Sequence, residues 1–324
     1  MSQLFVNLKT ALKESDQRLI VFPEATDERV LSAASRLGLE KLMTPLLIGD
    51  EVEIEEQSKK LSLDISKCVI INPNTYDKFD EMVDAFVTIR KGKATIEDAK
   101  KILLTENYFG TMLVQMDEAD GLVSGAVNST SDTVRPALQI IKTRPGIKKT
   151  SGVFIMVRGE ERYVFGDCAI NIAPTSDDLA EIAVESKKTA LVFDIEPKVA
   201  MLSFSTKGSA KSEETERVVE AISKAKEIDS SLVIDGEFQF DTAFVPSVAA
   251  KKAPDSVIQG DANVFIFPNL DAGNIGYKLT ERLGGFEAVG PILQGLNKPV
   301  NDLSRGCSSD DVYKLAMITA AQAK

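Results

Sequence analysis

Ser304 and Arg305 carry the strongest chemical signal in this sequence, within the segment NDLSRGCSSDD at residues 301–311. They come just before a helix expected at the C-terminus. A helix N-terminus presents free backbone N–H groups and about half a positive charge. An arginine and hydroxyls beside it therefore favour the binding of an anion. Ser308 and Asp311 also match a helix-capping pattern, and a capped helix without an anion site is the alternative interpretation.

Cys307 lies in the same segment, two residues after Arg305. A cysteine near an arginine and at a helix start can have a lowered pKa, so an acyl thioester on this thiol is one candidate chemistry. The chain contains no histidine. That absence removes the usual base for activating a thiol or hydroxyl, and every zinc site that uses histidine. Any acid or base must be Asp, Glu, Lys, Tyr or Cys.

A second hydroxyl-rich segment, SGAVNSTSDTVRP, runs from Ser124 to Pro136 after an apolar run. Ligands gather at the carboxyl ends of strands in parallel α/β sheets, and small residues let backbone amides approach a phosphate. Ser129, Thr130 and Arg135 of this segment are candidates for such contacts. Arg90, in the run RKGK, is another candidate cation, and an ordinary capped loop or helix end is the alternative in both places.

Strands and helices must position these segments. Short apolar runs alternate with helical patterns over most of the chain. The alternation is typical of parallel sheets covered by helices, and a turn at 158–161 predicts a hairpin in the second sheet. The predicted strands are Leu19–Phe22, Pro45–Ile48, Cys68–Ile71, Gly121–Ser124, Gly152–Val157, Tyr163–Phe165, Val199–Phe204, Leu232–Ile234 and Val264–Phe267. The predicted helices are 27–37, 77–90, 95–104, 108–116, 177–189, 212–228, 272–283 and 309–323.

Pro145 and Gly146 interrupt this pattern after a helix that begins near Asp132, and they predict a domain boundary. The length of 324 residues fits two domains of about 100 to 200 residues each. We expect a first α/β domain of residues 1–144 and 301–324, which includes the C-terminal helix, and a second α/β domain of residues 145–300.

The charge balance excludes some partners. There are 38 Lys and Arg against 49 Asp and Glu, a net charge of −11 without a basic run, so nucleic-acid binding is not expected. The three cysteines are too far apart for a disulfide framework, which indicates a reducing cytoplasm. No run approaches the roughly 18 apolar residues of a membrane span, and the N-terminus has no signal-peptide pattern. We therefore expect a cytoplasmic protein without a membrane partner.

Whole segments of the chain resemble the phosphotransacetylases of the phosphate acetyl/butyryltransferase family, over almost the entire length. The matching segments are Val21–Glu24 with Arg29, Arg90–Lys93, Asp120–Pro136, Gln139–Thr143, Pro268–Leu283, and Gly290–Leu296 through Ala320. The resemblance implies reversible transfer of an acetyl group between coenzyme A and inorganic phosphate, by direct thiolate attack in a ternary complex. Coenzyme A, acetyl-CoA, phosphate and acetyl phosphate would be substrates, with no cofactor and no metal. It also implies a homodimer of two-domain chains, with an interdomain cleft and an isocitrate or isopropylmalate dehydrogenase-like fold.

The resemblance also implies roles for individual residues. Asp311 matches the general base, Ser304 the hydroxyl beside the reacting thiol and carbonyl, and Arg305 the arginine that binds phosphate. Arg90 and Arg135 match arginines that bind coenzyme A and substrate. The full set of expected substrate-binding residues is Arg90, Arg135, Ser124, Ser129, Thr130 and Asn274.

Three positions depart from the family pattern. Asn128 stands where a histidine is expected, residues 171–174 lack an expected proline or acidic pattern, and Phe238 replaces a leucine. Asparagine does not titrate, so a histidine at position 128 cannot be essential to the chemistry. None of the three lies in the C-terminal segment.

Three other functions stay open from the sequence. A phosphate butyryltransferase would share the chemistry and have a larger acyl pocket. A decarboxylating dehydrogenase of similar fold would need a metal-binding aspartate cluster that the sequence does not display. A non-catalytic module that senses coenzyme A would be expected to lose the reacting residues, and the presence of Ser304, Arg305 and Asp311 favours the enzyme.

Overall fold

The computed structural model describes residues 3–323 and divides the chain into two compact units. The first unit contains Gln3–Arg144 and the chain from Leu296 onward, and the second contains Pro145–Gly295. Residues 296–300, which the sequence analysis assigned to the second domain, therefore group with the first. Asn297 explains the difference, because its side-chain amide donates to the carbonyls of Ile141 and Thr143 at 2.9 and 3.0 Å.

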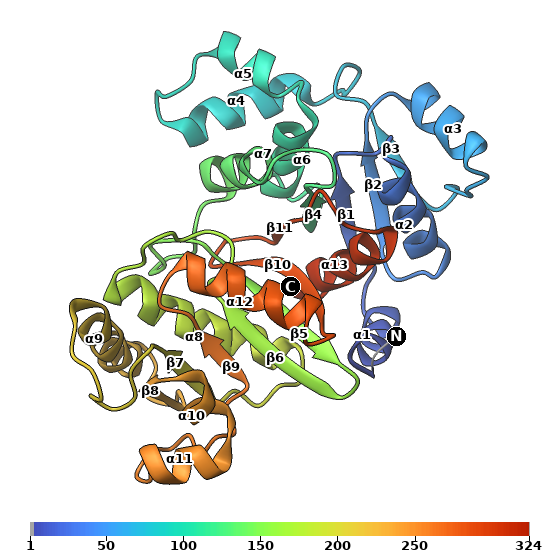
Figure 1. Ribbon diagram of the computed structural model, residues 1–324. Coiled ribbons are helices and arrows are strands. Elements are labelled where there is room, and N and C mark those ends of the chain that lie inside the picture. The colour runs from blue at the N-terminus through green and yellow to red at the C-terminus, as the bar shows by residue number, and fades with distance from the viewer. Residues whose placement is uncertain (1–2, 324) are drawn as a thin grey trace. The chain divides into compact units, whose positions relative to one another are not determined.

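The first unit has a five-stranded parallel sheet in the order β11-β4-β1-β2-β3 (Figure 1). Its strands are β1 (Leu19–Phe22), β2 (Thr44–Ile48), β3 (Val69–Ile71), β4 (Gly121–Ser124) and β11 (Val300–Asp302). The central strands are continuously apolar because helices cover both faces of such a sheet. In the register of β11 and β4, Asp302 lies opposite Ser124. The segments that follow these two strands therefore leave the sheet side by side.

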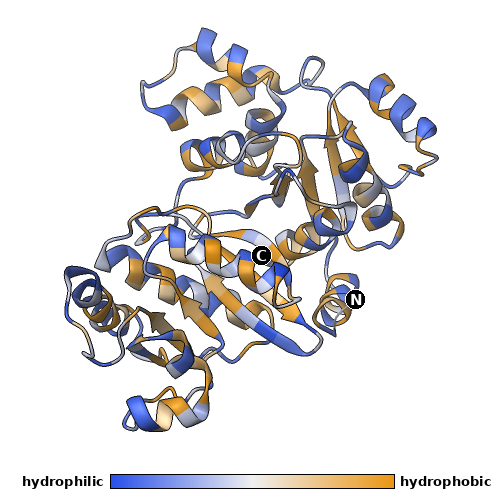
Figure 2. Cartoon of the chain, viewed as in Figure 1, coloured by the Kyte–Doolittle hydropathy of each residue, from blue (hydrophilic) through white to orange (hydrophobic). Residues whose placement is uncertain are grey.

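Nine helical segments of residues 3–323 belong to this unit. They are α1 (Gln3–Glu14), α2 (Glu28–Leu39), α3 (Glu51–Lys60), α4 (Phe79–Arg90), α5 (Ile96–Ile102), α6 (Glu106–Gln115), α7 (Thr130–Pro136), the π-helical turn η1 (Ala137–Ile141) and α13 (Ser309–Gln322). In Figure 2 the strands β1 and β2 are hydrophobic, whereas the peripheral helix α3 is largely hydrophilic.

Helix α13 packs against β4, β1, α2 and α1, and it is buried continuously from Val312 to Ala320. The contact with β4 is close: a Cβ on Gly121 would lie 2.8 Å from the Thr319 methyl carbon. The last helix of the chain is therefore a core element of the first unit. This packing holds the N-terminal end of α13 at a defined place beside the sheet.

The second unit has a mixed six-stranded sheet in the order β10-β5-β6-β9-β7-β8. The predicted hairpin is confirmed, since β5 and β6 pair antiparallel with Arg158 opposite Glu161. The strands are β5 (Ser151–Arg158), β6 (Glu161–Gly166), β7 (Val199–Leu202), β8 (Ile234–Phe238), β9 (Val264–Ile266) and β10 (Glu287–Gln294). The helices are α8 (Ser176–Val192), α9 (Glu213–Ile228), α10 (Phe240–Phe244), α11 (Pro246–Lys252) and α12 (Leu270–Arg282).

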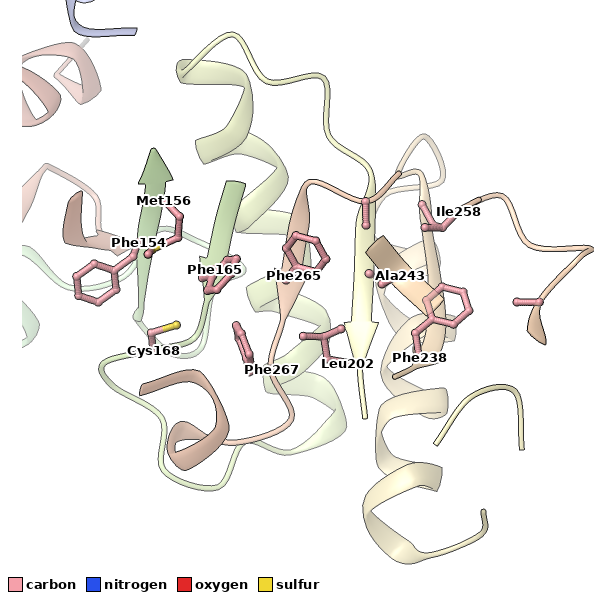
Figure 3. Packing of buried hydrophobic residues seen from close by; sticks show 13 residues of the cluster. Phe154, Met156, Phe165, Cys168, Leu202, Phe238, Ala243, Ile258, Phe265 and Phe267 are labelled. Atoms are coloured by element: carbon pink, nitrogen blue, oxygen red, sulfur yellow. The ribbon is translucent and has the colours of Figure 1, made fainter. Parts of the chain in front are cut away.

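Strand β10 was not predicted, because Gly290 and Pro291 interrupt its pattern and its register with β5 shifts between Val289 and Ile292. Aromatic rings fill the core of the second unit, where Phe165 neighbours both Phe265 and Phe267 (Figure 3). Phe238, which departs from the family pattern, is fully buried in the same cluster. The core of the second unit therefore accommodates the phenylalanine ring at this position.

No helix within residues 3–323 combines the length and the apolar character needed to cross a membrane.

Candidate active site

The turn between β11 and α13 presents Ser304 and Arg305 on the surface. The Leu303 amide extends the pairing of β11 by donating to the Ser124 carbonyl at 2.7 Å. The chain then turns tightly, since the Cys307 amide donates to the Ser304 carbonyl at 2.9 Å and the Gly306 amide to Ser304 Oγ at 3.3 Å. We call residues 303–308 the catalytic turn, after the role proposed for Ser304 and Arg305. Both predicted residues are exposed where α13 begins.

The predicted capping box of α13 is present. Asp311 Oδ2 accepts from the Ser308 amide at 2.7 Å and from Ser308 Oγ at 2.8 Å, and the Asp311 amide donates to Ser308 Oγ at 3.2 Å. Asp311 Oδ1 has no hydrogen-bond partner among residues 3–323. The capping interaction therefore orients the carboxylate and leaves one oxygen for another proton donor.

Arg29 holds the catalytic turn from the N-terminal end of α2. Its Nη1 donates to the carbonyls of Arg305 and Cys307 at 2.8 and 3.2 Å, and its Nη2 donates to the Ala126 carbonyl at 2.7 Å. Asp27 pairs with the same guanidinium at 2.8 Å, and this hydrogen bond raises the pKa of Arg29. One permanently charged group thus joins three loops. Arg29 is among the residues that carry the family resemblance, and the sequence analysis gave it no role.

Cys307 is buried beneath this arginine, with Sγ 3.8 Å from Arg29 Nη1. Burial raises the pKa of the Cys307 thiol to about 11, although Arg29 acts in the opposite direction. The lowering of the pKa that such a position can produce is therefore absent, because desolvation outweighs the neighbouring charge. A thiol with this pKa is protonated at neutral pH and is therefore a weak nucleophile.

The loop 125–128 after β4 has its backbone donors already occupied. The carboxylate of Glu24, which follows β1, accepts from four consecutive amides, those of Gly125, Ala126, Val127 and Asn128, at 3.0, 2.8, 3.0 and 2.7 Å. We had expected such amides to approach a phosphate. In this structure a carboxylate from the same chain fills that place.

The hydroxyls of the second predicted segment have different environments. Ser124 is buried, and its Oγ donates to Asn107 Oδ1 at 2.8 Å, so its predicted substrate contact has no support here. Ser129 caps α7, with its amide and Oγ donating to Asp132 Oδ2 at 3.1 and 2.6 Å. Thr130 is exposed at the first residue of that helix. Thr130 is therefore the most accessible of the three hydroxyls.

The two predicted coenzyme A arginines lie in the same electrostatic environment. Burial raises the pKa of Tyr108, and the charges of Arg135 and Arg90 both oppose that rise. Hydrogen bonds within the capping box of α7 lower the pKa of Asp132, and the charges of Arg135 and Arg305 act in the same direction. Arg135 therefore shares Tyr108 as a neighbour with Arg90, and Asp132 with Arg305.

Asn274 lies in α12 of the second unit, where its side-chain amide donates to the Cys168 carbonyl at 3.2 Å. The structure thus gives Asn274 a contact within its own unit. Its place in a substrate site stays a prediction.

Asp302, at the end of β11, was missed by the sequence analysis. It is 2% exposed, and its Oδ1 has no hydrogen-bond partner in the described chain. Burial raises the pKa of Asp302 to about 6, the nearby hydroxyls of Thr130 and Thr133 act in the opposite direction, and the charge of Glu24 adds to the rise. Only the tertiary fold could reveal this, because a single aspartate after a short strand has no sequence signature.

Comparisons with known proteins find similar chains over nearly the whole length of this one. The family model for phosphate acetyl/butaryl transferase matches residues 4–320. A phosphate acetyltransferase from Bacillus subtilis is 66% identical over 323 residues, 100% of both chains. A solved phosphotransacetylase from Streptococcus pyogenes is 59% identical, with a TM-score of 0.96 over 99% of each chain.

A more distant solved chain from Salmonella typhimurium, described as a 4-hydroxythreonine-4-phosphate dehydrogenase, has 13% identity and a TM-score of 0.55 over 95% of this chain and 100% of its own. This likeness concerns the fold alone. It agrees with the expected dehydrogenase-like α/β architecture.

We predict that Asp302→Asn makes stability less dependent on pH. The pKa of about 6 in the folded chain exceeds the value of about 3.9 for an unfolded aspartate, so the folded state binds this proton more tightly. Wild-type stability therefore falls as pH rises from about 4 through 6. Relative to wild type, the asparagine variant should gain about 1.4 kcal/mol of unfolding free energy between pH 5 and pH 8.

Urea unfolding at both pH values measures this difference, with the exposed Asp255→Asn as control. The control should differ from wild type by the same amount at pH 5 and pH 8. A pH-independent difference for Asp302→Asn would contradict the prediction.

Proposed function

Because the chain belongs to the phosphate acetyl/butaryl transferase family, we propose that it moves an acetyl group between coenzyme A and inorganic phosphate by direct attack of one substrate on the other. The activity is that of a phosphate acetyltransferase, the name carried by a full-length relative with 66% identity. The observation that carries the proposed mechanism is the catalytic turn, which exposes Ser304 and Arg305 beside the capped carboxylate of Asp311.

In the direction of acetyl-CoA formation, Asp311 takes the thiol proton of coenzyme A. The thiolate attacks the carbonyl carbon of acetyl phosphate, a carbon–sulfur bond forms and the carbon–oxygen bond to phosphate breaks. Ser304 donates a hydrogen bond to the oxyanion of the tetrahedral intermediate, an interaction of roughly 2.7 to 4 kcal/mol in comparable sites. Arg305 and the N-terminus of α13 stabilise the departing phosphate. The reaction is reversible because thioester and acyl phosphate are both activated.

Transfer of the proton to Asp311 requires that the pKa of the coenzyme A thiol be lowered. Free aspartate and a free thiol have pKa values of about 3.9 and 8.5, a gap of about 4.6 units or 6 kcal/mol. Asp310 contributes little, because its carboxylate pairs with Arg36 at 3.2 Å and Lys314 at 2.6 Å. We therefore assign Arg90, Arg135 and Arg305 the main task of lowering the pKa of the bound thiol. This assigns them a role in chemistry as well as in binding.

Coenzyme A is in this proposal a substrate and not a resident cofactor. Arginines and backbone N–H groups supply the positive charge at the phosphate, so no metal is assigned a role. A cytoplasmic location follows from these intracellular substrates and agrees with three cysteines that are all free. Transfer of a butyryl group is the second candidate, and the 66% identical relative favours acetyl.

We also propose that the enzyme is a homodimer, formed through α12. Ile275 and Leu279 in this helix and Leu283, which caps its C-terminal end, recur every four residues and are 58%, 52% and 83% exposed. The opposite face of α12 packs inward, where Tyr277 stacks on Phe154 with ring centroids 3.9 Å apart. An exposed apolar stripe on a rigidly packed helix suits an interface with a second copy.

Asp311→Asn is expected to reduce turnover by about 10²- to 10⁴-fold, the usual contribution of a general base. The amide cannot take the thiol proton, whereas its oxygen can still cap α13. Thiol release from acetyl-CoA with phosphate or arsenate measures the change, and circular dichroism verifies folding.

Two neighbours control for this test. Asp310→Asn should keep turnover within a few-fold, and Ser308→Ala should lower stability by about 1 kcal/mol through loss of the cap while retaining most activity. If Ser308→Ala loses as much turnover as Asp311→Asn, the carboxylate acts as a cap and not as a base.

Arg90→Ala and Arg135→Ala should each raise the KM for coenzyme A by about 10- to 150-fold, because a charge-assisted bond to phosphate contributes roughly 1.5 to 3 kcal/mol. Arg305→Ala should instead raise the KM for acetyl phosphate more than that for coenzyme A. Steady-state kinetics with both substrates separates these effects, and Arg158→Ala in the second unit is the matched control. An unchanged coenzyme A KM together with a lower melting temperature would refute the binding role.

Leu279→Asp should convert the dimer to a monomer, because it puts a charge in the middle of the apolar stripe on α12. Sedimentation velocity gives the mass directly. Val52→Asp is the matched control, since Val52 is an exposed apolar residue of α3 in the first unit with 65% exposure. Equal sedimentation of Leu279→Asp and wild type would exclude α12 as the interface.

A further inference from the structure

The carboxylate of Glu24 accepts hydrogen bonds from four backbone amides, a role that the sequence around it does not indicate. It is 9% exposed, and each of its carboxylate oxygens accepts from two successive amides of loop 125–128. Gly125 at φ 112° allows the turn that points these amides to one place. Such a concave group of N–H donors is the type of site that binds phosphate or carboxylate anions. Here the anion is built into the chain.

Loop 125–128 is connected to the catalytic turn through Arg29. The Ala126 amide donates to Glu24 Oε2 at 2.8 Å, and the Ala126 carbonyl accepts from Arg29 Nη2 at 2.7 Å. Arg29 Nη1 then donates to the Arg305 carbonyl at 2.8 Å. A displacement of Ala126 would therefore move the acceptor that orients one end of the guanidinium. The other end of that guanidinium holds the backbone of Arg305.

The negative charge of Glu24 also matters to the arrangement. A carboxylate has acceptor sites on both oxygens, whereas glutamine has one accepting oxygen and one NH₂ donor. In Glu24→Gln, two backbone amides would face the NH₂ group and lose their acceptor. The loop would relax although the side chain keeps its size. The four donors thus require an anion at this place.

We propose that Glu24 is a positioning residue for acetyl transfer, acting through Ala126 and Arg29 to set the place of Ser304 and Arg305. The inference rests on the proposed roles of those two residues in the reaction. Glu24 itself touches no reacting atom in this scheme. Its removal should therefore affect turnover more than the binding of coenzyme A by Arg90, which lies at the end of α4 and forms none of these hydrogen bonds.

Kinetics of Glu24→Gln give the first test. A misplacement of about 1 Å can cost about a hundredfold in rate, so we expect kcat to fall by at least about tenfold while the coenzyme A KM changes less than about threefold. Glu237→Gln is the matched control. Glu237 is a 2% exposed glutamate of the second unit that accepts from Ser205 Oγ at 2.7 Å and the Gly208 amide at 2.8 Å. It should lose stability and retain kcat.

Chemical rescue of Glu24→Ala gives the second test. This variant leaves the four amides without an acceptor and creates space for a small anion, so added formate should restore kcat at least about tenfold with saturation. Chloride at equal ionic strength should not restore it, and formate should not activate wild type. A purely structural loss would not respond to formate during turnover of folded enzyme. If Glu24→Ala is insoluble, the Glu24→Gln kinetics decide alone.

Two results would overturn the proposal: a folded Glu24→Gln variant with kcat within twofold of wild type, or a soluble Glu24→Ala variant that formate does not rescue. Arg305→Ala, assayed in parallel, separates this from a failure of the proposed mechanism. If Arg305→Ala stays active, the role of Arg305 is wrong. If Arg305→Ala is inactive and Glu24→Gln is unimpaired, only the positioning role of Glu24 fails.

Discussion

Strand β11, near the end of the chain, pairs in parallel with β4, and the Leu303 amide continues the pairing to the Ser124 carbonyl at 2.7 Å. This pairing places two segments that are far apart in the sequence at one edge of the first sheet. The catalytic turn leaves β11 and loop 125–128 leaves β4 from that edge. Because α13 then packs into the core of the same unit, the helix N-terminus beside Ser304 cannot drift away from them.

Positive charge in this region serves two separate purposes. The guanidinium of Arg29 donates to backbone carbonyls and pairs with Asp27, so it stabilises the loops. Few of its N–H groups remain to bind a substrate. The charge of Arg135 acts on Tyr108 together with that of Arg90, and on Asp132 together with that of Arg305. A protein with a net charge of −11 can therefore attract coenzyme A and phosphate through a local cationic region. The net negative charge of the chain therefore does not prevent the binding of an anionic substrate.

Four carboxyl groups meet the same edge of the sheet in four different environments. Glu24 accepts from backbone amides, and Asp27 pairs with Arg29. Asp302 is buried with an unpartnered oxygen, and burial raises its pKa to about 6. Asp311 accepts from its own helix cap and keeps one oxygen without a partner among the described residues. Of these four groups, Asp311 is therefore the one that combines an ordered carboxylate with an open oxygen, as the proposed base requires.

The sequence by itself determined the features that depend on neighbouring residues. The alternation of apolar runs predicted the α/β class, and the short segment with Ser304 and Arg305 predicted both the helix cap and the site. The tertiary structure alone decided the long-range contacts. Glu24 accepts hydrogen bonds from the amides of loop 125–128, and Arg29 donates to a carbonyl of the catalytic turn. Burial likewise raises the pKa of Cys307, although an arginine lies two residues before it in the sequence. Hydrogen-bond partners and desolvation depend on residues distant in the chain, and local patterns carry no information about them.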